Sequence, residues 1–407
     1  MENRNILVTG ATGFIGQRLV RKLVLQGNNV KCLVRRTSDV SVLEQFDCQI
    51  VYGDTVEEPD SVANALDNVR TVYHLAALTH TVYSRDLIRI NEQGTRNVLD
   101  ACSGMEAPPT AVIVSSLAAV GPSNGSQLHD EEGTRNPVSF YGRSKAASEL
   151  TSFEYAGRVP ISIVRPPIVL GGGDRQGLEM FRIIDRSGWH FVPGFFNRVY
   201  SVIHVDDLVD ALIHVANQGK RLTPSSHSRG IYFASSPETF TYSQLGRMIG
   251  QALGRRRTRV LKIAKPVMWT VAMINEVKAR LSQSAQFVNI DKFHEAFAGS
   301  WACSSEKIES EVGFRITTTM LERLKQTAKW YRQHGWLKPS PGDFEKEATI
   351  HSGQIPAPIF PIAPSEAARV SQSHPSEPAT HADHWSEKTT SESERASYSS
   401  NTELMEG

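Results

Sequence analysis

The sequence predicts an α/β fold with a doubly wound parallel sheet, a smaller and mainly helical second part, and a disordered tail. Short apolar segments alternate with helical ones over the first 165 of 407 residues. This pattern is typical of a parallel sheet covered by helices on both faces. After residue 166 helical segments dominate, and after residue 338 large aliphatic residues become rare. We therefore expect three parts, at 1–165, 166–338 and 339–407.

The first part is expected to contain six strands, each marked by a short apolar run. Helices are expected between them because apolar residues recur there at helical spacing, as Ile15, Leu19 and Leu23 do. The expected strands are 5–9, 30–34, 49–52, 71–75, 111–115 and 161–165, and the expected helices are 14–26, 60–66, 86–101 and 141–155.

The second part is expected to bind the substrate and to return some strands to the main sheet. Helical patterns cover 208–216, 239–254 and most of 266–333. The tail from residue 340 on holds 12 Ser and 7 Pro. Such a composition cannot bury enough apolar surface to offset the entropy lost on ordering, so the tail is predicted to be disordered.

Charge and cysteine content narrow the classes of partner. The net charge of +1 argues against nucleic-acid binding, but residues 340–407 carry −7 and leave +8 on the rest. That excess suits an anionic ligand, and scattered surface Lys and Arg explain it equally well. The cysteines have no metal-ligand spacing and no leader or spanning segment is found, so we expect a cytoplasmic protein without a metal. They are Cys32, Cys48, Cys102 and Cys303.

A glycine-rich turn follows the first expected strand. Its sequence is Gly10-Ala11-Thr12-Gly13-Phe14-Ile15-Gly16. Gly10 allows the tight turn, Gly13 lets a pyrophosphate approach the backbone, and Gly16 permits close packing of helix on strand. The helix that starts here offers free N–H groups to the phosphates. The turn therefore predicts a dinucleotide site.

The ends of the second and third strands bear on which dinucleotide binds. Arg35 stands where an acid would bind the ribose hydroxyls of NAD, and it suits the 2′-phosphate of NADP. We therefore favour NADP and keep NAD open, because Arg35 could instead stack on adenine. Asp54 could accept a hydrogen bond from the adenine amino group or could cap a turn.

Candidate catalytic groups lie at the fifth strand and the helix after it. Tyr141 and Lys145 are four residues apart and share a helical face. A nearby ammonium lowers the pKa of a phenol, so Tyr141 could exchange a proton with a carbonyl or alcohol. Ser115 and Ser116 end the fifth strand, where a hydroxyl could hold the reacting oxygen. Hydrogen bonding at the strand end is the simpler explanation for either serine alone.

As a set, these motifs resemble the extended short-chain dehydrogenase/reductase family over residues 4–338. Further matching strings are His74-Leu75-Ala76-Ala77, Asn91-Glu92-Gln93-Gly94-Thr95, Arg165-Pro166-Pro167 and His204-Val205-Asp206-Asp207. The resemblance implies a Rossmann fold, a bound nicotinamide dinucleotide and a Ser-Tyr-Lys site. It favours Ser116 over Ser115, and it gives Lys145 the nicotinamide ribose as well. It also implies cofactor contacts from Thr12, Phe14, Ile15, Thr55, Ala76, Pro166 and Ile168.

Three functions remain open within this resemblance. The chain looks most like dihydroflavonol-reductase-like and 3β-hydroxysteroid-dehydrogenase-like members, because Arg165-Pro166-Pro167-Ile168 lacks the Asn typical of nucleotide-sugar enzymes. We therefore expect an NAD(P)-dependent oxidoreductase acting on a secondary alcohol or ketone, with a lipophilic substrate in view. The alternatives are a nucleotide-sugar epimerase or dehydratase, and an NADP-binding redox sensor without turnover. The intact Ser116, Tyr141 and Lys145 count against the sensor.

Two remaining features have plain structural explanations. The string 204–207 is interpreted as a helix start capped by Asp206 or Asp207 rather than as a metal site. Residues 255–275 join a basic cluster to an apolar stretch, which could contact an anionic membrane. A solvated turn followed by a helix of the substrate part is the favoured explanation. The sequence also leaves a homodimer open.

Overall fold

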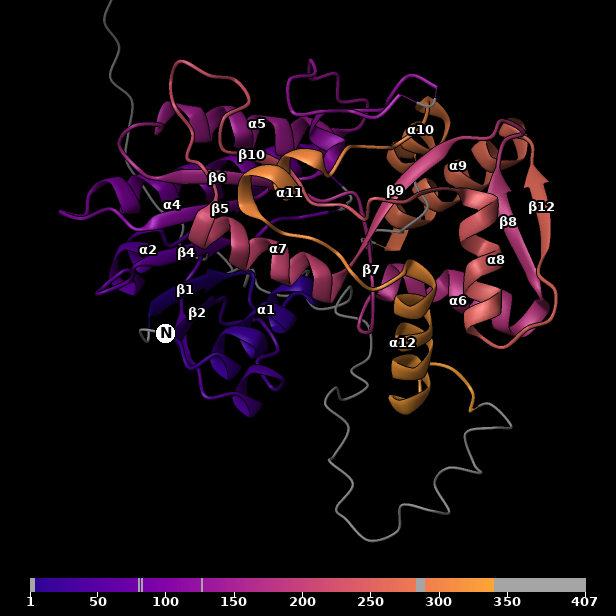
Figure 1. Ribbon diagram of the computed structural model, residues 1–407, viewed down its shortest axis with the longest axis horizontal. Coiled ribbons are helices and arrows are strands. Elements are labelled where there is room, and N and C mark those ends of the chain that lie inside the picture. Colours follow the sequence, from indigo (N-terminus) through magenta and orange to yellow (C-terminus); the bar gives the residue numbers. More distant parts are fainter. Residues whose placement is uncertain (1–3, 80, 82, 126, 283–289, 340–407) are drawn as a thin grey trace, which may run out of the picture. The chain divides into compact units, whose positions relative to one another are not determined.

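The computed structural model describes residues 4–79, 81, 83–125, 127–282 and 290–339. From residue 340 on, the tail that we expect to be disordered lies outside the described residues. A seven-stranded sheet forms the centre, in the order β10-β6-β5-β4-β1-β2-β3 (Figure 1). The strands are β1 (Asn5–Thr9), β2 (Asn29–Val34), β3 (Gln49–Tyr52), β4 (Thr71–His74), β5 (Thr110–Val114), β6 (Ile161–Arg165) and β10 (Ile231–Phe233).

Every neighbouring pair in this sheet runs parallel, so the predicted doubly wound parallel sheet is confirmed. The strand order reverses at β1, with β2 on one side and β4 on the other. In such sheets ligands bind in the crevice outside the carboxyl ends of the strands, at the point of reversal. The glycine turn starts at that point, because it follows β1 directly.

Alternate side chains of each strand feed two separate cores. Ile6 and Val8 of β1 pack with α1 (Phe14–Leu25) and α7 (Val205–Gln218) on one face. Leu7 points to the other face, against α2 (Pro59–Ala65) and α4 (Gly94–Ser103). Burying both faces requires nearly continuous apolar strands, which is why the runs are visible in the sequence. The helices on the two faces thus pack on the same sheet, whose strand ends lie along one edge.

The other described segments form two small sheets and a set of helices, most of them beside the main sheet, whereas α11 (Glu306–Val312) packs with α7 in its first core (Figure 1). One sheet has the order β11-β9-β7, and the other pairs β12 with β8 in parallel. The strands are β7 (Ile168–Leu170), β8 (Trp189–Pro193), β9 (Val199–His204), β11 (Thr239–Thr241) and β12 (Arg259–Ile263). The helices are α6 (Arg175–Ser187), α8 (Tyr242–Ala252), α9 (Lys265–Ser282), α10 (Ile290–Ala298), α11 (Glu306–Val312) and α12 (Met320–Gln333).

The structure corrects three details expected from the sequence. The helix expected at 86–101 is α3 (Ser84–Ile88), a π-helical turn (Arg89–Gln93) and α4. The helix expected at 239–254 starts only at Tyr242, because β11 takes the first residues to pair with β9. The cap of α7 is the His204 ring, whose Nδ1 accepts a hydrogen bond from the Asp206 N–H at 3.3 Å. Asp207 instead pairs with Arg323 of α12.

No helix within the described ranges is long and apolar enough to cross a membrane. The same residues contain no group of three or more His, Cys, Asp or Glu side chains arranged to hold a metal ion.

Candidate active site

The residues singled out from the sequence line one edge of the main sheet. The glycine turn follows β1, Arg35 follows β2, and Asp54 lies just beyond β3. Ala76, Ser116 and Pro166 stand just beyond β4, β5 and β6. Because all these strands run parallel, their carboxyl ends meet at the same edge. The fold therefore brings these predicted residues to one edge of the sheet, and α5 (Phe140–Glu154) carries Tyr141 and Lys145.

In the glycine turn the fold leaves no room for a side chain at Gly10 and Gly16, whereas Gly13 is less crowded. A Cβ at Gly10, whose φ is +71°, would lie 2.6 Å from the Ala76 nitrogen, and one at Gly16 would collide with the Gly10 carbonyl. A Cβ at Gly13 would approach only the Gly10 oxygen, at 3.2 Å. Gly13 is exposed and begins α1, and no described side chain caps that helix. The turn thus presents bare backbone and the N-terminus of a helix, which fits a pyrophosphate.

The neighbouring strand ends carry the groups expected to meet adenosine. Arg35 is exposed, and its guanidinium has no partner among the described residues. Arg36 instead lies over the Tyr52 ring at 5.9 Å. The Asp54 carboxylate accepts hydrogen bonds from the backbone N–H groups of residues 56 and 57, so it does cap a turn. Thr55 fixes that turn to the next layer, because its carbonyl accepts from Asn97.

His74 and Asn91 connect the elements that carry the candidate site through buried hydrogen bonds. Thr9 and His74 share a hydrogen bond of 2.8 Å between Oγ1 and Nδ1, which links β1 to β4. Burial, with a smaller effect of Lys145, lowers the pKa of His74 to about 3, so its ring is neutral. The Asn91 amide bonds to the Leu78 backbone and to Ser144 Oγ on α5. The loop after β4 is thereby fastened to the helix that carries Tyr141.

Ser116 and Tyr141 meet beside β5, whereas Ser115 faces away. Ser115 Oγ donates to Glu149 at 2.6 Å. Ser116 accepts from the Ala118 N–H at 3.1 Å, and its hydroxyl interacts with the Tyr141 phenol. The Leu117 N–H donates to the Pro166 carbonyl, which joins this turn to the end of β6. Ile168 follows at the start of β7 and packs against the same apolar cluster as Tyr141.

The pKa of Tyr141 differs from the expectation. Burial raises it to about 12, with a smaller upward effect of Glu295, although the Ser116 hydrogen bond lowers it. Lys145 Nζ donates to the Val114 carbonyl at 2.6 Å. Burial lowers the pKa of Lys145 to about 8, opposed by Glu149. Lys145 is not among the groups that shift the pKa of Tyr141, so the predicted lowering by Lys145 is not found, and burial is the largest effect.

A buried ion-pair network that sequence reasoning missed supports these groups. Glu149 is fully buried on α5 and accepts from Arg165 at 2.8 and 2.6 Å, and from Arg135 at 3.0 Å. Burial alone would raise the pKa of Glu149, but the two arginines and Ser115 hold it below its usual value. The network joins α5, β5 and β6. Its only sequence signal was an acid four residues after Lys145, on the same helical face.

Two residues of α10 complete the start of α5. Asp291 accepts hydrogen bonds from the backbone N–H groups of Phe140 and Tyr141, at 2.8 and 3.3 Å. Lys292 lies over the Tyr141 ring at 5.5 Å. Local sequence held no signal for this contact, because the two segments are about 150 residues apart.

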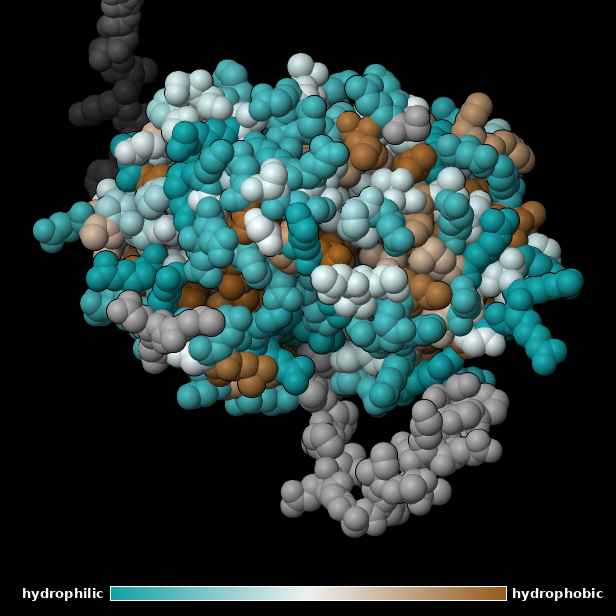
Figure 2. Space-filling model, in the orientation of Figure 1, coloured by the Kyte–Doolittle hydropathy of each residue, from teal (hydrophilic) through white to brown (hydrophobic). Residues whose placement is uncertain are grey.

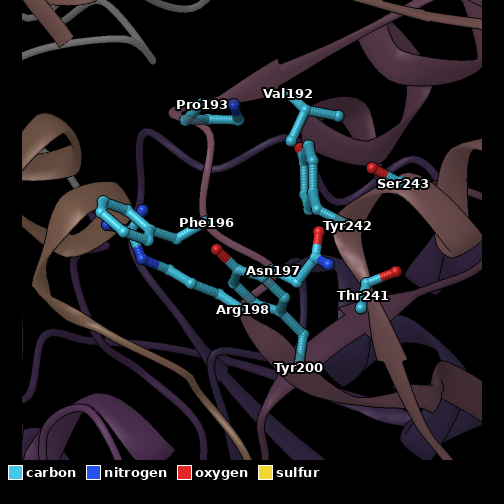
Figure 3. A pocket seen from close by; sticks show the side chains of 9 residues that line it. All are labelled: Val192, Pro193, Phe196, Asn197, Arg198, Tyr200, Thr241, Tyr242 and Ser243. Carbon is cyan, nitrogen blue, oxygen red and sulfur yellow. The ribbon is translucent and has the colours of Figure 1, made fainter. Parts of the chain in front are cut away.

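A small pocket lies on the outer side of this cluster (Figure 3). Tyr200 and Tyr242 form its inner wall, with their ring centroids 5.5 Å apart, and both pack in the cluster that contains Tyr141. Phe196 stands at its rim, and Arg198 is held there by the carbonyls of Ala296 and Phe297. The other lining residues are Val192, Pro193, Asn197, Thr241 and Ser243.

Comparison with known proteins identifies the family. The sequence profile of the NAD-dependent epimerase/dehydratase family matches residues 6–227. The chain belongs to this family. The resemblance to extended short-chain dehydrogenase/reductases is thereby confirmed, and the chain is an enzyme of that group.

Two curated relatives and one solved structure of this family illustrate the likeness. Ceramide reductase of Caulobacter vibrioides is 26% identical over 82% of this chain and 96% of its own length. Sterol demethylase protein B of Methylococcus capsulatus is 28% identical over 81% of this chain and 99% of its own. The fold matches dTDP-glucose 4,6-dehydratase of Streptomyces venezuelae, solved with NAD bound, with a TM-score of 0.64 at 23% identity, over 82% of this chain and 99% of that one.

Proposed function

We propose that this enzyme is an NADP-dependent oxidoreductase that interconverts a lipophilic ketone and its secondary alcohol. The observation that carries the proposal is the pair of hydroxyls, Ser116 and Tyr141, at the border between the nucleotide crevice and an apolar cluster. One hydroxyl can hold a carbonyl oxygen while the other exchanges its proton. The nicotinamide, when bound, supplies or accepts the hydride.

Each catalytic side chain has one task in this proposal. Ser116 donates a hydrogen bond to the substrate oxygen and orients it toward Tyr141. Tyr141, protonated because its pKa is raised, gives its phenolic proton to that oxygen during reduction. Lys145 stays close, buried and hydrogen-bonded to the Val114 carbonyl, where it holds the nicotinamide ribose. Glu149 is a positioning residue, since it acts through Lys145 and Ser115.

The cofactor preference rests on Arg35. Its guanidinium is exposed and without a partner among the described residues, and it stands at the end of β2, where the adenosine ribose is expected. Guanidinium forms strong, directional hydrogen bonds with phosphate. A 2′-phosphate would therefore find a ready partner. The remaining cofactor contacts proposed are Gly10, Thr12, Gly13, Phe14, Ile15, Gly16, Asp54, Thr55, Ala76, Pro166 and Ile168.

The substrate class rests on the surroundings of the two hydroxyls. The cluster that Tyr141 joins is formed by Leu117, Ala118, Val120, Tyr200, Phe233 and Trp301, with Ile168 and Tyr242 at its border. These side chains are buried against one another, and Tyr141, Ile168 and Tyr242 border them. Ligand sites are lined mostly by apolar side chains, with a few polar groups that fix the orientation of the ligand. Two relatives that match this chain over nearly their whole length are named for ceramide and sterol chemistry. Both facts favour a lipid-like ketone over a sugar nucleotide.

The test is oxidation of NADPH by the purified enzyme in the presence of long-chain and sterol ketones. We expect net oxidation, with kcat/KM reduced about 100- to 10,000-fold in Tyr141→Phe, because the proton donor is removed. Tyr155→Phe is the matched control, since Tyr155 lies at the end of the same helix and its hydroxyl bonds to Asp100. Its turnover should stay near that of the unaltered enzyme.

Other outcomes point to other functions. Unchanged turnover in Tyr141→Phe would remove Tyr141 from the mechanism. A cofactor that co-purifies and never exchanges, together with conversion of nucleotide sugars and no net NADPH oxidation, would favour an epimerase. Binding of NADPH without turnover of any ketone or nucleotide sugar would favour a sensor.

A further inference from the structure

Helix α9 (Lys265–Ser282) turns an apolar stripe toward solvent. Val267, Val271, Ile274 and Val277 follow one another at intervals of four, three and three residues, which places them on one face of the helix. They are 55%, 42%, 57% and 53% exposed. The opposite face, with Ala272 and Ala279, is buried. A row of exposed aliphatic side chains on a surface helix marks an interaction site.

Further exposed apolar side chains lie on the β8–β12 ribbon, whose second strand leads directly into α9, and in the loop after β8. Phe195 and Phe196 are 63% and 77% exposed in that loop. Lys262 Nζ donates to the Phe195 carbonyl at 3.0 Å, which fixes the loop beside the start of α9. Phe191 and Leu261 are opposite each other in the ribbon, and both are exposed. In Figure 2, small groups of brown and tan side chains lie among teal ones along the edge of the molecule near α9 and β12. We call these eight residues, from the stripe, loop and ribbon together, the apolar face.

The segment that builds most of this face is also the most basic in the chain. Residues 255–282 contain eight Lys or Arg and one acid, a net charge of +7. Residues 1–339 as a whole carry +8. Nearly all the positive excess of the body thus lies in these 28 residues, and Lys262 and Lys265 stand beside the apolar face. Scattered surface charge would not gather in this way.

We infer that the apolar face and its basic border dock on the surface of an anionic lipid bilayer. Aliphatic and aromatic side chains enter the boundary between headgroups and acyl chains, while Lys and Arg bind the anionic headgroups. Helix α9 is not apolar enough to cross the bilayer, so it lies along it. A second copy of the chain is a poorer occupant. A symmetric contact through this face would bring Lys262 and Lys265 of both copies toward one another, and like charges repel.

In the docked orientation the bilayer surface lies next to the pocket lined by Phe196, Tyr200 and Tyr242. Phe196 belongs both to the apolar face and to the pocket rim (Figure 3). Tyr200 and Tyr242 form the inner wall and pack in the cluster of Tyr141. A membrane-dissolved substrate would meet the pocket mouth without crossing water. Docking itself needs no substrate, so it can be tested apart from the proposed function.

The experiment is co-sedimentation of the full chain with vesicles of phosphatidylglycerol and, separately, of phosphatidylcholine. We expect binding to phosphatidylglycerol that weakens with salt, and little binding to phosphatidylcholine. The double variant Val271→Asp and Ile274→Asp should abolish vesicle binding, because it places two negative charges in the apolar stripe. Lys262→Glu with Lys265→Glu should weaken it about tenfold or more. Leu25→Asp is the control, since Leu25 is an exposed aliphatic residue at the end of α1, outside the apolar face, and its replacement should leave binding unchanged.

Two results would overturn the inference. One is a full chain that stays in the supernatant with both vesicles. The other is a double Asp variant that sediments like the unaltered chain. Light scattering on the protein alone tests the competing occupant. If the unaltered chain is a dimer, the double Asp variant is a monomer and neither binds vesicles, the face is assigned to a second copy. Retained NADPH binding and an unchanged melting temperature would show that each variant is folded.

Discussion

The two halves of the crevice are built differently. At the ends of β1 and β2 the groups proposed to meet the cofactor are backbone or exposed, as at Gly13 and Arg35. At the ends of β5 and β6 they are buried and paired with one another, as Glu149 is with Arg165. In the proposed function, Gly13 and Arg35 gain their partners when a nucleotide binds. The second half is already held in place by its own charges.

This difference separates binding from stability. Removing an exposed group costs only the contacts that it makes with a ligand. Removing one member of a buried ion pair leaves the other charge desolvated and uncompensated, which costs far more than the pair contributes. Changes on the nucleotide side should therefore weaken binding, and changes on the reaction side should weaken the fold.

The largest effect is expected for Glu149→Gln. The change leaves Arg165, which is 1% exposed, without its carboxylate, and should lower the free energy of unfolding by about 3–5 kcal/mol. Urea unfolding measures it. Glu154→Gln is the control, since its pair with Arg96 is exposed and should contribute no more than about 1 kcal/mol. Equal losses in the two variants would contradict the comparison.

A smaller effect, on cofactor binding rather than on stability, is expected for Arg35→Ala. Loss of a charged hydrogen bond to the 2′-phosphate should weaken NADPH binding about 10- to 100-fold and leave NADH binding and the melting temperature unchanged. Fluorescence titration of both cofactors checks this. In Arg36→Ala, where the guanidinium lies over Tyr52, NADPH affinity should change little. A parallel loss for NADH and NADPH would remove Arg35 from the cofactor preference.

The smallest effect concerns pH and applies to the reaction side. Burial lowers the pKa of Lys145 from 10.5 to about 8, so its ammonium is present below that pH and lost above it. We expect kcat/KM for ketone reduction to fall about tenfold for each pH unit above about 8. Lys145→Arg, whose charge persists, should lack this fall even if it is slower. The same fall in both enzymes would assign the titration to another group.

The sequence predicted what local pattern controls. The strands of the main sheet are buried on both faces and therefore read as apolar runs, and the strand ends placed Gly13, Arg35 and Ser116 at one edge. It did not predict contacts between distant segments. Asp291 reaches α5 from about 150 residues away, and β11 becomes a strand only because β9 lies beside it. Nor did residue types reveal that burial raises the pKa of Tyr141.

The strand β10 has a consequence for how the chain is made. It comes from residues 231–233, yet it pairs with β6, which ends at residue 165. During synthesis β6 therefore remains an open sheet edge until 68 further residues have been added, a delay of about 3–14 s at typical elongation rates. Open edges pair readily with other chains. In this interval the nascent protein therefore presents an open strand for pairing, although the six strands β1 to β6 have already been made.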